Sequence, residues 1–248
     1  MGTPIEPTSS SPAAPGERRP IKARSSRWAS ALSARLAAGG VTPNAISAAS
    51  VAFAAAGAAA LVSLRWAAWC PWLTAGLMVV AILGIQGRLV CNLLDGMVAV
   101  EGGKGGPLGG IYNDLPDRLA DPLLLAAAGY AAWPLPFAVE LGWLAAAGSL
   151  LTAYVRVLGK SLGAGTTFAG PMAKQHRMAL LTGGCLVAAG LGFVGLARWP
   201  LYVVLAVVAI GCVLTCGRRL KLIAADLRAN AAAKAATPPL QPAEATAP

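Results

Sequence analysis

Charged residues are scarce in this chain. They make up 12% of its 248 residues, whereas about 25% is usual for soluble domains. Hydrophobic residues make up 56%, and the mean hydropathy is +0.63. So few charges cannot cover so much apolar side chain, which excludes soluble globular, disordered, collagen-like and disulfide-scaffold proteins. We therefore expect lipid to be the solvent for most of the chain.

Acidic residues are rarer than basic ones, at 10 against 20, which gives a formal net charge of +10. A basic balance is typical of nucleic-acid-binding proteins. Here the positive charges lie beside apolar segments, and the sequence contains no nucleic-acid-binding motif. We therefore expect membrane lipids with anionic headgroups as partners, and no nucleic acid. The five cysteines form no metal-ligand pair and are interpreted as reduced packing residues.

Six apolar stretches are long enough to cross a bilayer, which takes about 20 helical residues. A short amphipathic helix is expected before them at 25–38, where Arg27 and Arg35 can face lipid headgroups. The predicted fold class is therefore all-α integral membrane, with six transmembrane helices preceded by a short interfacial helix. One membrane domain would cover 25–217, between a disordered basic tail at 1–24 and a basic Ala/Pro-rich tail at 218–248. The predicted spans lie near 43–64, 70–94, 112–133, 136–158, 177–196 and 199–217.

Lysine and arginine predict the orientation of these spans. They concentrate in the two tails, in the loops at 95–111 and 159–176, and at the adjacent membrane edge, whereas only Arg65 and Arg198 lie on the other side. Positive charge is retained on the cytoplasmic side of a membrane. We therefore expect a multi-pass protein of a bacterial inner membrane, with both termini in the cytoplasm.

Carboxylates gather where the second and third predicted spans adjoin. Asp114, Asp117 and Asp121 follow an i, i+3, i+7 spacing, which places them on one face of a helix. Asn92 and Asp95 are three residues apart at the end of the preceding span. Because the third span must return beside the second, we expect the two polar faces to meet.

Carboxylates at membrane depth are costly and need compensation. One arrangement pairs them with Arg88 and Arg118. The other binds Mg²⁺ or Mn²⁺, which prefer hard oxygen ligands. Two such ions would suit displacement at phosphorus, because they neutralise a pyrophosphate and its leaving oxygen. We favour the metal, with ion pairing as the alternative.

At these residues the sequence resembles the CDP-alcohol phosphatidyltransferase family. The first half of that family's acidic signature is matched by Asn92-Leu-Leu-Asp95-Gly96-Met-Val-Ala99, and the second half by Asp117-Arg-Leu-Ala-Asp121. Further likenesses cover most of the membrane region. They are Val41-Thr42-Pro43-Asn44, Tyr154-Val-Arg156 and Gly170-Pro-Met-Ala-Lys174-Gln-His-Arg177.

The sequence departs from the family signature at several positions. Asn92 stands where the first acid is expected, and Val100 stands where an arginine is expected. The spacer is four residues longer than usual if Asp117 and Asp121 are the last two acids. A second register keeps the usual spacer with Gly109, Asn113 and Asp117, but it loses another acid. We prefer the first register, in which Asp114 can supply the missing carboxylate.

The resemblance implies transfer of a phosphatidyl group from CDP-diacylglycerol to a hydroxyl acceptor, such as a sugar or polyol phosphate, with release of CMP. It implies two divalent ions, Mg²⁺ or Mn²⁺, and catalytic roles for Asp121 as general base and for Asp117. Oligomeric state is left open between a monomer and a homodimer. The implied metal ligands are Asp95, Asp117, Asp121, Asn92 and Asp114; the nucleotide-binding residues are Asn44, Asn92, Asp95, Gly96 and Ala99; the acceptor-binding residues are Arg156, Lys174 and Arg177.

Two other functions remain open at this point. Asn113-Asp114-Leu-Pro-Asp117-Arg-Leu-Ala-Asp121 also resembles the first motif of intramembrane aromatic prenyltransferases, which use Mg²⁺ and a pyrophosphate leaving group. That family needs a second acid-rich motif, and the chain has no acid pair after Asp121. A non-enzymatic transporter or scaffold would be favoured by internal repeats, which the sequence lacks. Phosphatidyl transfer is therefore the preferred prediction.

Overall fold

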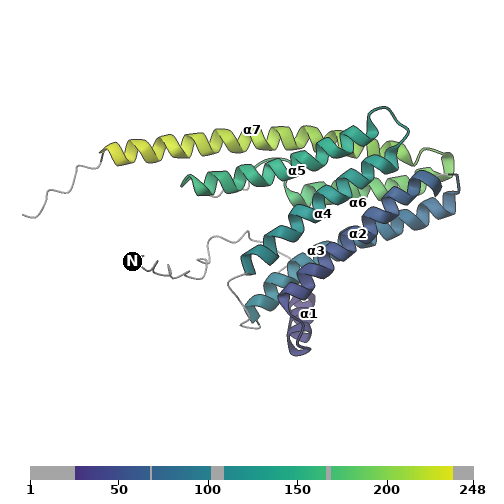
Figure 1. The fold of residues 1–248 in the computed structure, drawn as a ribbon, viewed down its shortest axis with the longest axis horizontal. Coiled ribbons are helices and arrows are strands. Elements are labelled where there is room, and N and C mark those ends of the chain that lie inside the picture. Colours follow the sequence, from purple (N-terminus) through teal and green to yellow (C-terminus); the bar gives the residue numbers. More distant parts are fainter. Residues whose placement is uncertain (1–25, 68, 102–108, 166–168, 237–248) are drawn as a thin grey trace, which may run out of the picture.

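The computed structural model describes residues 26–67, 69–101, 109–165 and 169–236, and this part of the chain is built from helices joined by short connections (Figure 1). The all-α integral membrane architecture expected from composition is confirmed. The elements are α1 (Arg27–Ala38), α2 (Pro43–Ala67), α3 (Pro71–Glu101), α4 (Gly109–Ala132), α5 (Ala138–Ser161), α6 (Lys174–Leu191), the 3₁₀ turn η3 (Gly192–Val194) and α7 (Arg198–Ala236).

Five helices in the described part are long and apolar enough to cross a membrane: α2, α3, α5, α6 and α7. The remaining long helix, α4, is also packed into the bundle, where Leu124 and Leu125 are fully buried. Its sequence carries Asp114, Asp117 and Asp121, so its composition is not that of an ordinary span. The count of six spans stays a prediction.

Small residues let the helices approach closely, and α2 against α3 is the clearest case. A Cβ atom added to Gly84 would lie 2.7 Å from the Cα of Gly57 and 2.7 Å from the carbonyl oxygen of Phe53. Without side chains at this crossing, the two backbones are in van der Waals contact. The chain therefore positions the end of α3 by packing along α2, which also packs along α4.

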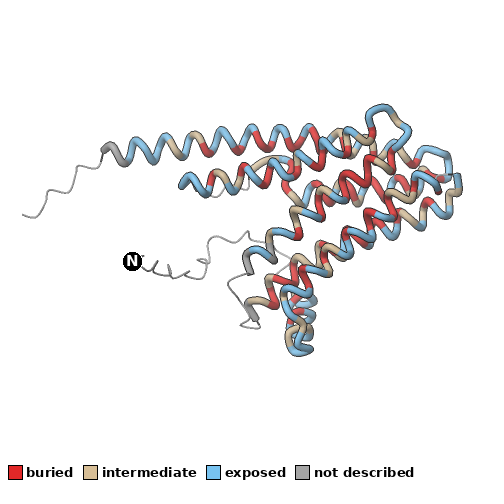
Figure 2. The backbone as a smooth tube through the Cα atoms, in the orientation of Figure 1, coloured by how far each residue is buried: buried red, intermediate tan, exposed pale blue. Residues whose placement is uncertain are grey.

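Helix ends differ from the predicted boundaries in two places that matter for the site. The second span is predicted to end near residue 94, whereas α3 continues to Glu101. The last span is predicted to end at 217, whereas α7 continues as helix into the predicted tail as far as Ala236. The first turns of this extension stay packed against α5, where Ile223 and Leu227 join the apolar cluster around Val155, and the remainder is largely exposed (Figure 2). Its Ala-rich sequence explains the helix, because alanine has the highest helix propensity.

The predicted interfacial segment contains α1, which packs across the end of α3. Ala29 is buried against Leu93 and Met97 of α3, while Trp28 and Leu32 are exposed. Exposed apolar side chains on a short helix beside a membrane bundle suit an interfacial position. That position for α1 stays a prediction.

Candidate functional site

Charged side chains from three helices meet inside the bundle, near the end of α3 and the start of α4. Charges buried in a membrane bundle are costly unless they are paired. Here the carboxylates of α3 and α4 lie among basic groups of α3 and α6. We call this set the charged cluster; it comprises Arg88, Asp95, Asp117, Asp121, Lys174 and Arg177.

Asp117 is the centre of the charged cluster. Its Oδ1 accepts hydrogen bonds from Arg88 Nη2 and from Asn92 Nδ2, both at 3.0 Å. Its Oδ2 accepts a hydrogen bond from Lys174 Nζ, which also donates to Asn92 Oδ1 at 2.6 Å. Asp117 thus links α3, α4 and α6 through three neighbouring side chains.

Asp121 lies one turn deeper in α4 and has a different environment. Its Oδ1 is 2.6 Å from Arg88 Nη2, and its Oδ2 accepts a hydrogen bond from Arg177 Nη2 at 2.7 Å. Arg177 also donates from Nη1 to the carbonyl oxygen of Met172 at 3.0 Å and to Thr152 Oγ1 at 3.3 Å. Both oxygens of Asp121 are therefore in ion pairs with buried arginines.

Asp95 is the third carboxylate, on the outer turn of α3 beyond Asn92. Its side chain is buried, and Oδ2 accepts a hydrogen bond from Ser47 Oγ at 2.8 Å. Oδ1 accepts one from the backbone N–H of Gly96 at 2.6 Å. Among the described residues, no basic group lies within ion-pair distance of Asp95, which distinguishes it from Asp117 and Asp121.

Asp114 lies apart from the charged cluster and is half-exposed. Its Oδ1 is 3.0 Å from Arg118 Nη2 and 3.5 Å from Arg156 Nη2. The predicted common face is thus divided: Asp117 and Asp121 belong to the charged cluster, whereas Asp114 contacts Arg118 and Arg156 outside it. We call Arg118 and Arg156 the outer basic pair. The ion-pair alternative weighed for Arg88 and Arg118 is present at both places.

The other predicted site residues lie at helix ends around the charged cluster. Gly96 and Ala99 are on the last turns of α3, and Asn44 is exposed on the first turn of α2. Ser47 is one turn from Asn44 and reaches Asp95, so the start of α2 lies beside the end of α3. The side chain of Asn113 falls outside the described residues. The assigned roles of all these residues stay predictions.

Sequence reasoning left Ser47 and Arg219 out of the site and named Arg88 only as an ion-pair partner of the carboxylates. Ser47 holds Asp95, and Arg88 joins Asp117 to Asp121. Arg219 of α7 donates to the backbone oxygens of Thr152 and Ala169 and so fixes the segment before α6. A fully buried arginine in an apolar span was the available signal for Arg88. Ser47 and Arg219 act through contacts distant in sequence, for which the pattern gives no signal.

The carboxylates of the site differ in whether they are available to a divalent metal ion. In residues 26–67, 69–101, 109–165 and 169–236, no group of three or more His, Cys, Asp or Glu side chains is placed to hold a metal ion. Asp117 and Asp121 are each in two ion pairs. Asp95 is the carboxylate with none, and Mg²⁺ commonly binds one or two carboxylates together with substrate phosphates. The residues therefore fit an ion held at Asp95 with a phosphate ligand.

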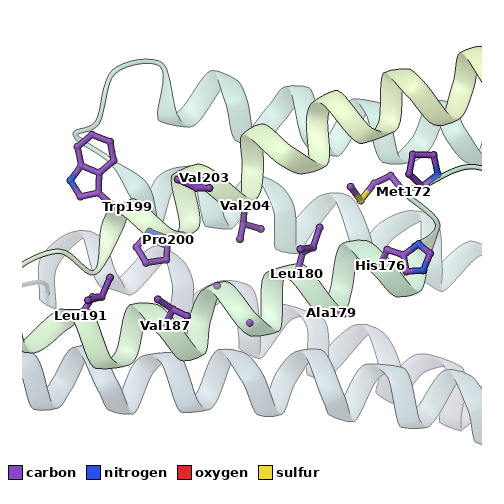
Figure 3. A pocket seen from close by; sticks show the side chains of 13 residues that line it. Met172, His176, Ala179, Leu180, Val187, Leu191, Trp199, Pro200, Val203 and Val204 are labelled. Atoms are coloured by element: carbon purple, nitrogen blue, oxygen red, sulfur yellow. The ribbon is translucent and has the colours of Figure 1, made fainter.

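An apolar groove of about 830 Å³ runs between α6 and the first half of α7 (Figure 3). His176 and Met172 lie at one end of it, and Trp199 and Leu191 lie at the other. The first end lies at the first turn of α6, which also carries Lys174 and Arg177, although neither of these lines the groove. The groove therefore begins at the same end of α6 as the charged cluster.

No protein-family model and no curated protein sequence matches this chain. Solved structures do match its fold. A structure of phosphatidylinositol phosphate synthase from Mycobacterium tuberculosis in complex with manganese and citrate is 18% identical, with a TM-score of 0.60 over 79% of this chain and 88% of that chain. A structure of the same synthase with CDP-DAG bound is 20% identical, with a TM-score of 0.60 over 80% of this chain and 94% of that chain.

This chain has the fold of that synthase. The resemblance to the CDP-alcohol phosphatidyltransferases is thereby confirmed for the fold. At these identities, what the synthase binds is a statement about the synthase.

Proposed function

We propose that this protein transfers a phosphatidyl group from CDP-diacylglycerol to a hydroxyl acceptor and releases CMP, as a step in phospholipid biosynthesis. The observation that carries the proposal is the convergence of Asn92, Asp95 and Asp117 in a fold shared with a synthase whose solved structure holds CDP-DAG. We place the reaction at the cytoplasmic face of a bacterial inner membrane, where the positive charges of the sequence accumulate.

The pairing of α3 with α4 supports the register that keeps the usual spacer. Asn92 bonds Asp117, and Arg88, one turn earlier on α3, contacts Asp121, one turn later on α4. Asp121 therefore lies beside Arg88, about two turns of α3 away from Asp95. The Asp117 side chain is 12% exposed and the Asp121 side chain 3%. We accordingly propose Asp117 as the general base, in place of Asp121.

In the proposed reaction, the acceptor hydroxyl oxygen attacks the phosphorus atom that carries diacylglycerol. The bond from that phosphorus to the bridging oxygen of CMP breaks, and CMP leaves with the bonding electrons. A carboxylate oxygen of Asp117 takes the hydroxyl proton, a contribution typically worth about 10² to 10⁴ in rate. Asn92 and Lys174 hold the Asp117 carboxylate in position by the contacts described above.

A divalent cation, Mg²⁺ or Mn²⁺, would neutralise charge on the diphosphate when bound. Asp95 is the residue that fits it best, because its carboxylate is buried, oriented by Ser47 and Gly96, and outside the ion pairs of the charged cluster. Ser47 and the Gly96 N–H fix the carboxylate from behind, as supporting hydrogen bonds do at metal sites. Gly96 and Ala99 on the next turn leave room for the nucleotide.

The acceptor would bind at the outer basic pair. Arg118 and Arg156 come from different helices and converge on one oxygen of Asp114, which is half-exposed. Two guanidinium groups directed at one point suit a phosphate, for which arginine has matching donor geometry. Arg177 is buried against Asp121 and is better suited to holding the cluster than to contacting an acceptor.

The groove between α6 and α7 would take one acyl chain of the lipid substrate. It is lined mainly by apolar side chains and begins at His176, on the first turn of α6 (Figure 3). The 18 residues of α6 extend roughly 27 Å, at about 1.5 Å per residue. A chain entering from the side would therefore keep its diphosphate at the charged cluster.

The test is CMP release by the full chain in lipid nanodiscs, with CDP-diacylglycerol, Mn²⁺ and a panel of acceptors that includes inositol phosphate and glycerol phosphate. We expect acceptor-dependent CMP release that is abolished in Asp95→Asn and retained in Glu140→Gln, an exposed acid at the far end of α5. Arg156→Gln should raise the KM for a phosphorylated acceptor and leave that for CDP-diacylglycerol unchanged. Absence of CMP with every acceptor, together with turnover of an isoprenyl pyrophosphate, would replace the proposal with prenyl transfer.

A further inference from the structure

Lys174 occupies an unusual place for an ammonium group. It is the first residue of α6, and its Nζ lies between the amide oxygen of Asn92 and the carboxylate of Asp117. Both ligands are oxygens, one from α3 and one from α4. A cation bridging oxygen ligands on two facing helices has the same role as a metal ion.

We propose that the Lys174 ammonium is a built-in cation that replaces one of the two divalent ions implied by the sequence resemblance, so that the protein binds a single ion, at Asp95. The inference rests on the proposed function and concerns the same site. Lys174 would supply the positive charge that an exchangeable divalent ion would otherwise supply.

The presence of asparagine at position 92 explains why an ammonium group can take the place of a metal ion. The resemblance expects an acid at this position, and an amide removes one negative charge while keeping an oxygen ligand. Both polar atoms of the Asn92 amide are hydrogen-bonded: Nδ2 donates to Asp117 Oδ1 at 3.0 Å, and Oδ1 accepts a hydrogen bond from Lys174 Nζ at 2.6 Å. A ligand pair with one negative charge suits a monovalent cation.

Charge balance in the charged cluster leads to the same conclusion. The cluster contains three carboxylates (Asp95, Asp117 and Asp121) and three cations (Arg88, Lys174 and Arg177), so it is formally neutral. The diphosphate of CDP-diacylglycerol adds two negative charges, which one divalent ion balances. A second divalent ion would leave two positive charges uncompensated in a buried site, which is costly.

Hydrogen bonds hold the segment that precedes Lys174 and α6 in place. Thr215 of α7 accepts a hydrogen bond from the N–H of Met172 at 2.9 Å, and Arg177 donates to the Met172 carbonyl at 3.0 Å. Gly170 has a φ of +124°, and a Cβ there would lie 2.4 Å from the Thr215 side chain. This position therefore requires glycine. The fixed backbone positions the start of α6, and the hydrogen bonds to Asn92 and Asp117 hold the ammonium there.

The experiment counts Mn²⁺ ions bound per chain by electron paramagnetic resonance of free Mn²⁺, with the full chain in detergent and saturating CDP-diacylglycerol, because the ion at Asp95 takes a phosphate ligand. Protein-free micelles of the same composition give the background. We expect about one ion for the wild type and for Asn92→Asp, because the ammonium remains in place. The double variant Asn92→Asp/Lys174→Met restores an acid and removes the ammonium, and should bind about two. Lys221→Met, an exposed basic residue of α7, is the control and should bind about one.

Two bound ions in the wild type would overturn the proposal, as would no bound ion, and neither result depends on how the variants fold. The same count in the wild type and in a double variant that remains monodisperse on gel filtration would also overturn it. The count needs no turnover, so its result is separate from the result of the CMP-release assay. If the wild type binds one ion but shows no acceptor-dependent CMP release, phosphatidyl transfer is rejected and the Lys174 assignment stands.

Discussion

Asp117 and Asp121 differ in burial and in partners, although they lie one helical turn apart on α4. Asp117 bonds an amide and an ammonium as well as Arg88, whereas Asp121 contacts only arginines within the described residues. An acid enclosed by two guanidinium groups stabilises the bundle. Asp117, which is bonded to the Asn92 amide and is more exposed than Asp121, is the acid that we propose exchanges a proton with the substrate.

Substituting these two acids separates catalysis from stability. Asp117→Asn should lower CMP release by about 10² to 10⁴, because the base is lost. Asp121→Asn leaves a buried arginine without its partner and should lower the free energy of unfolding by about 3–5 kcal/mol. Turnover and denaturant unfolding in detergent, measured on both variants, test this assignment. A stable Asp121→Asn protein that has lost turnover would restore Asp121 as the base.

The sequence predicts the acids of the site better than their partners. Spacing along one helix places Asp117 and Asp121 on a common face, because the helical repeat is local information. The compensation of Asp121 depends on Arg177, which is 56 residues away in the chain. Only the packing of α6 against α3 and α4 brings this pair together, and no local pattern encodes that packing.

At the scale of the elements, the crossing of α2 and α3 sets the position of the site. Gly57 and Gly84 allow the two backbones to touch, and the same helices carry Ser47 and Asp95 towards each other. Apolar length and small residues predict that such helices exist and pack closely. They do not predict where polar helices end: α3 continues to Glu101, and Asp95 on its last turns accepts a hydrogen bond from Ser47 of α2.

Enlarging the α2–α3 crossing should destabilise the bundle. Gly84→Ala places a methyl group against the backbone of α2, and overpacking of this kind costs about 1–3 kcal/mol. Gly76→Ala is a matched control in the same helix, because a Cβ there meets nothing within 4 Å. Thermal unfolding in detergent should show a lower Tm for Gly84→Ala only. Equal Tm values for the two variants would contradict the close crossing.

The groove between α6 and α7 can be tested through the length of the acyl chain. Gly183 lines the groove and has nothing within 4 Å of an added Cβ, so Gly183→Leu should fold and obstruct the groove. We expect the KM for long-chain CDP-diacylglycerol to rise on the order of fivefold, the equivalent of about 1 kcal/mol of poor packing. Short-chain substrate should be unaffected. Gly190→Leu, on the same helix outside the groove, is the control, and an equal effect there would refute the assignment.

At the scale of the whole molecule, the bundle presents its charged cluster at the end where α3 finishes and α4 and α6 begin (Figure 1). Among the described basic residues, Arg118, Arg156 and Lys174 lie towards this end of α4, α5 and α6, whereas Arg65 and Arg198 lie at the opposite ends of α2 and α7. In the proposed reaction, the lipid substrate would reach this site sideways through the bilayer, while the polar acceptor would arrive from water. The overall class was predictable because it depends on composition, which needs no knowledge of tertiary contacts.

Orientation follows from the same charge distribution. With six spans, including α4, both termini should lie in the cytoplasm. Single cysteines introduced at Ser10 and Ala245, in a background lacking the native cysteines, should resist a membrane-impermeant thiol reagent in intact cells and react after lysis. Labelling of only one terminus in intact cells would indicate an odd number of spans and would separate α3 and α4 from a shared cytoplasmic site.

The measurement that tests the account most directly is mass spectrometry of the lipid formed from CDP-diacylglycerol in the presence of Mn²⁺ and a phosphorylated polyol. Phosphatidyl transfer predicts a product whose mass is that of the phosphatidyl group joined to the acceptor, formed in a one-to-one ratio with CMP and lost in Asp117→Asn. The contradicting result is CDP-diacylglycerol recovered unchanged with every acceptor, under conditions in which the purified protein is folded and binds Mn²⁺.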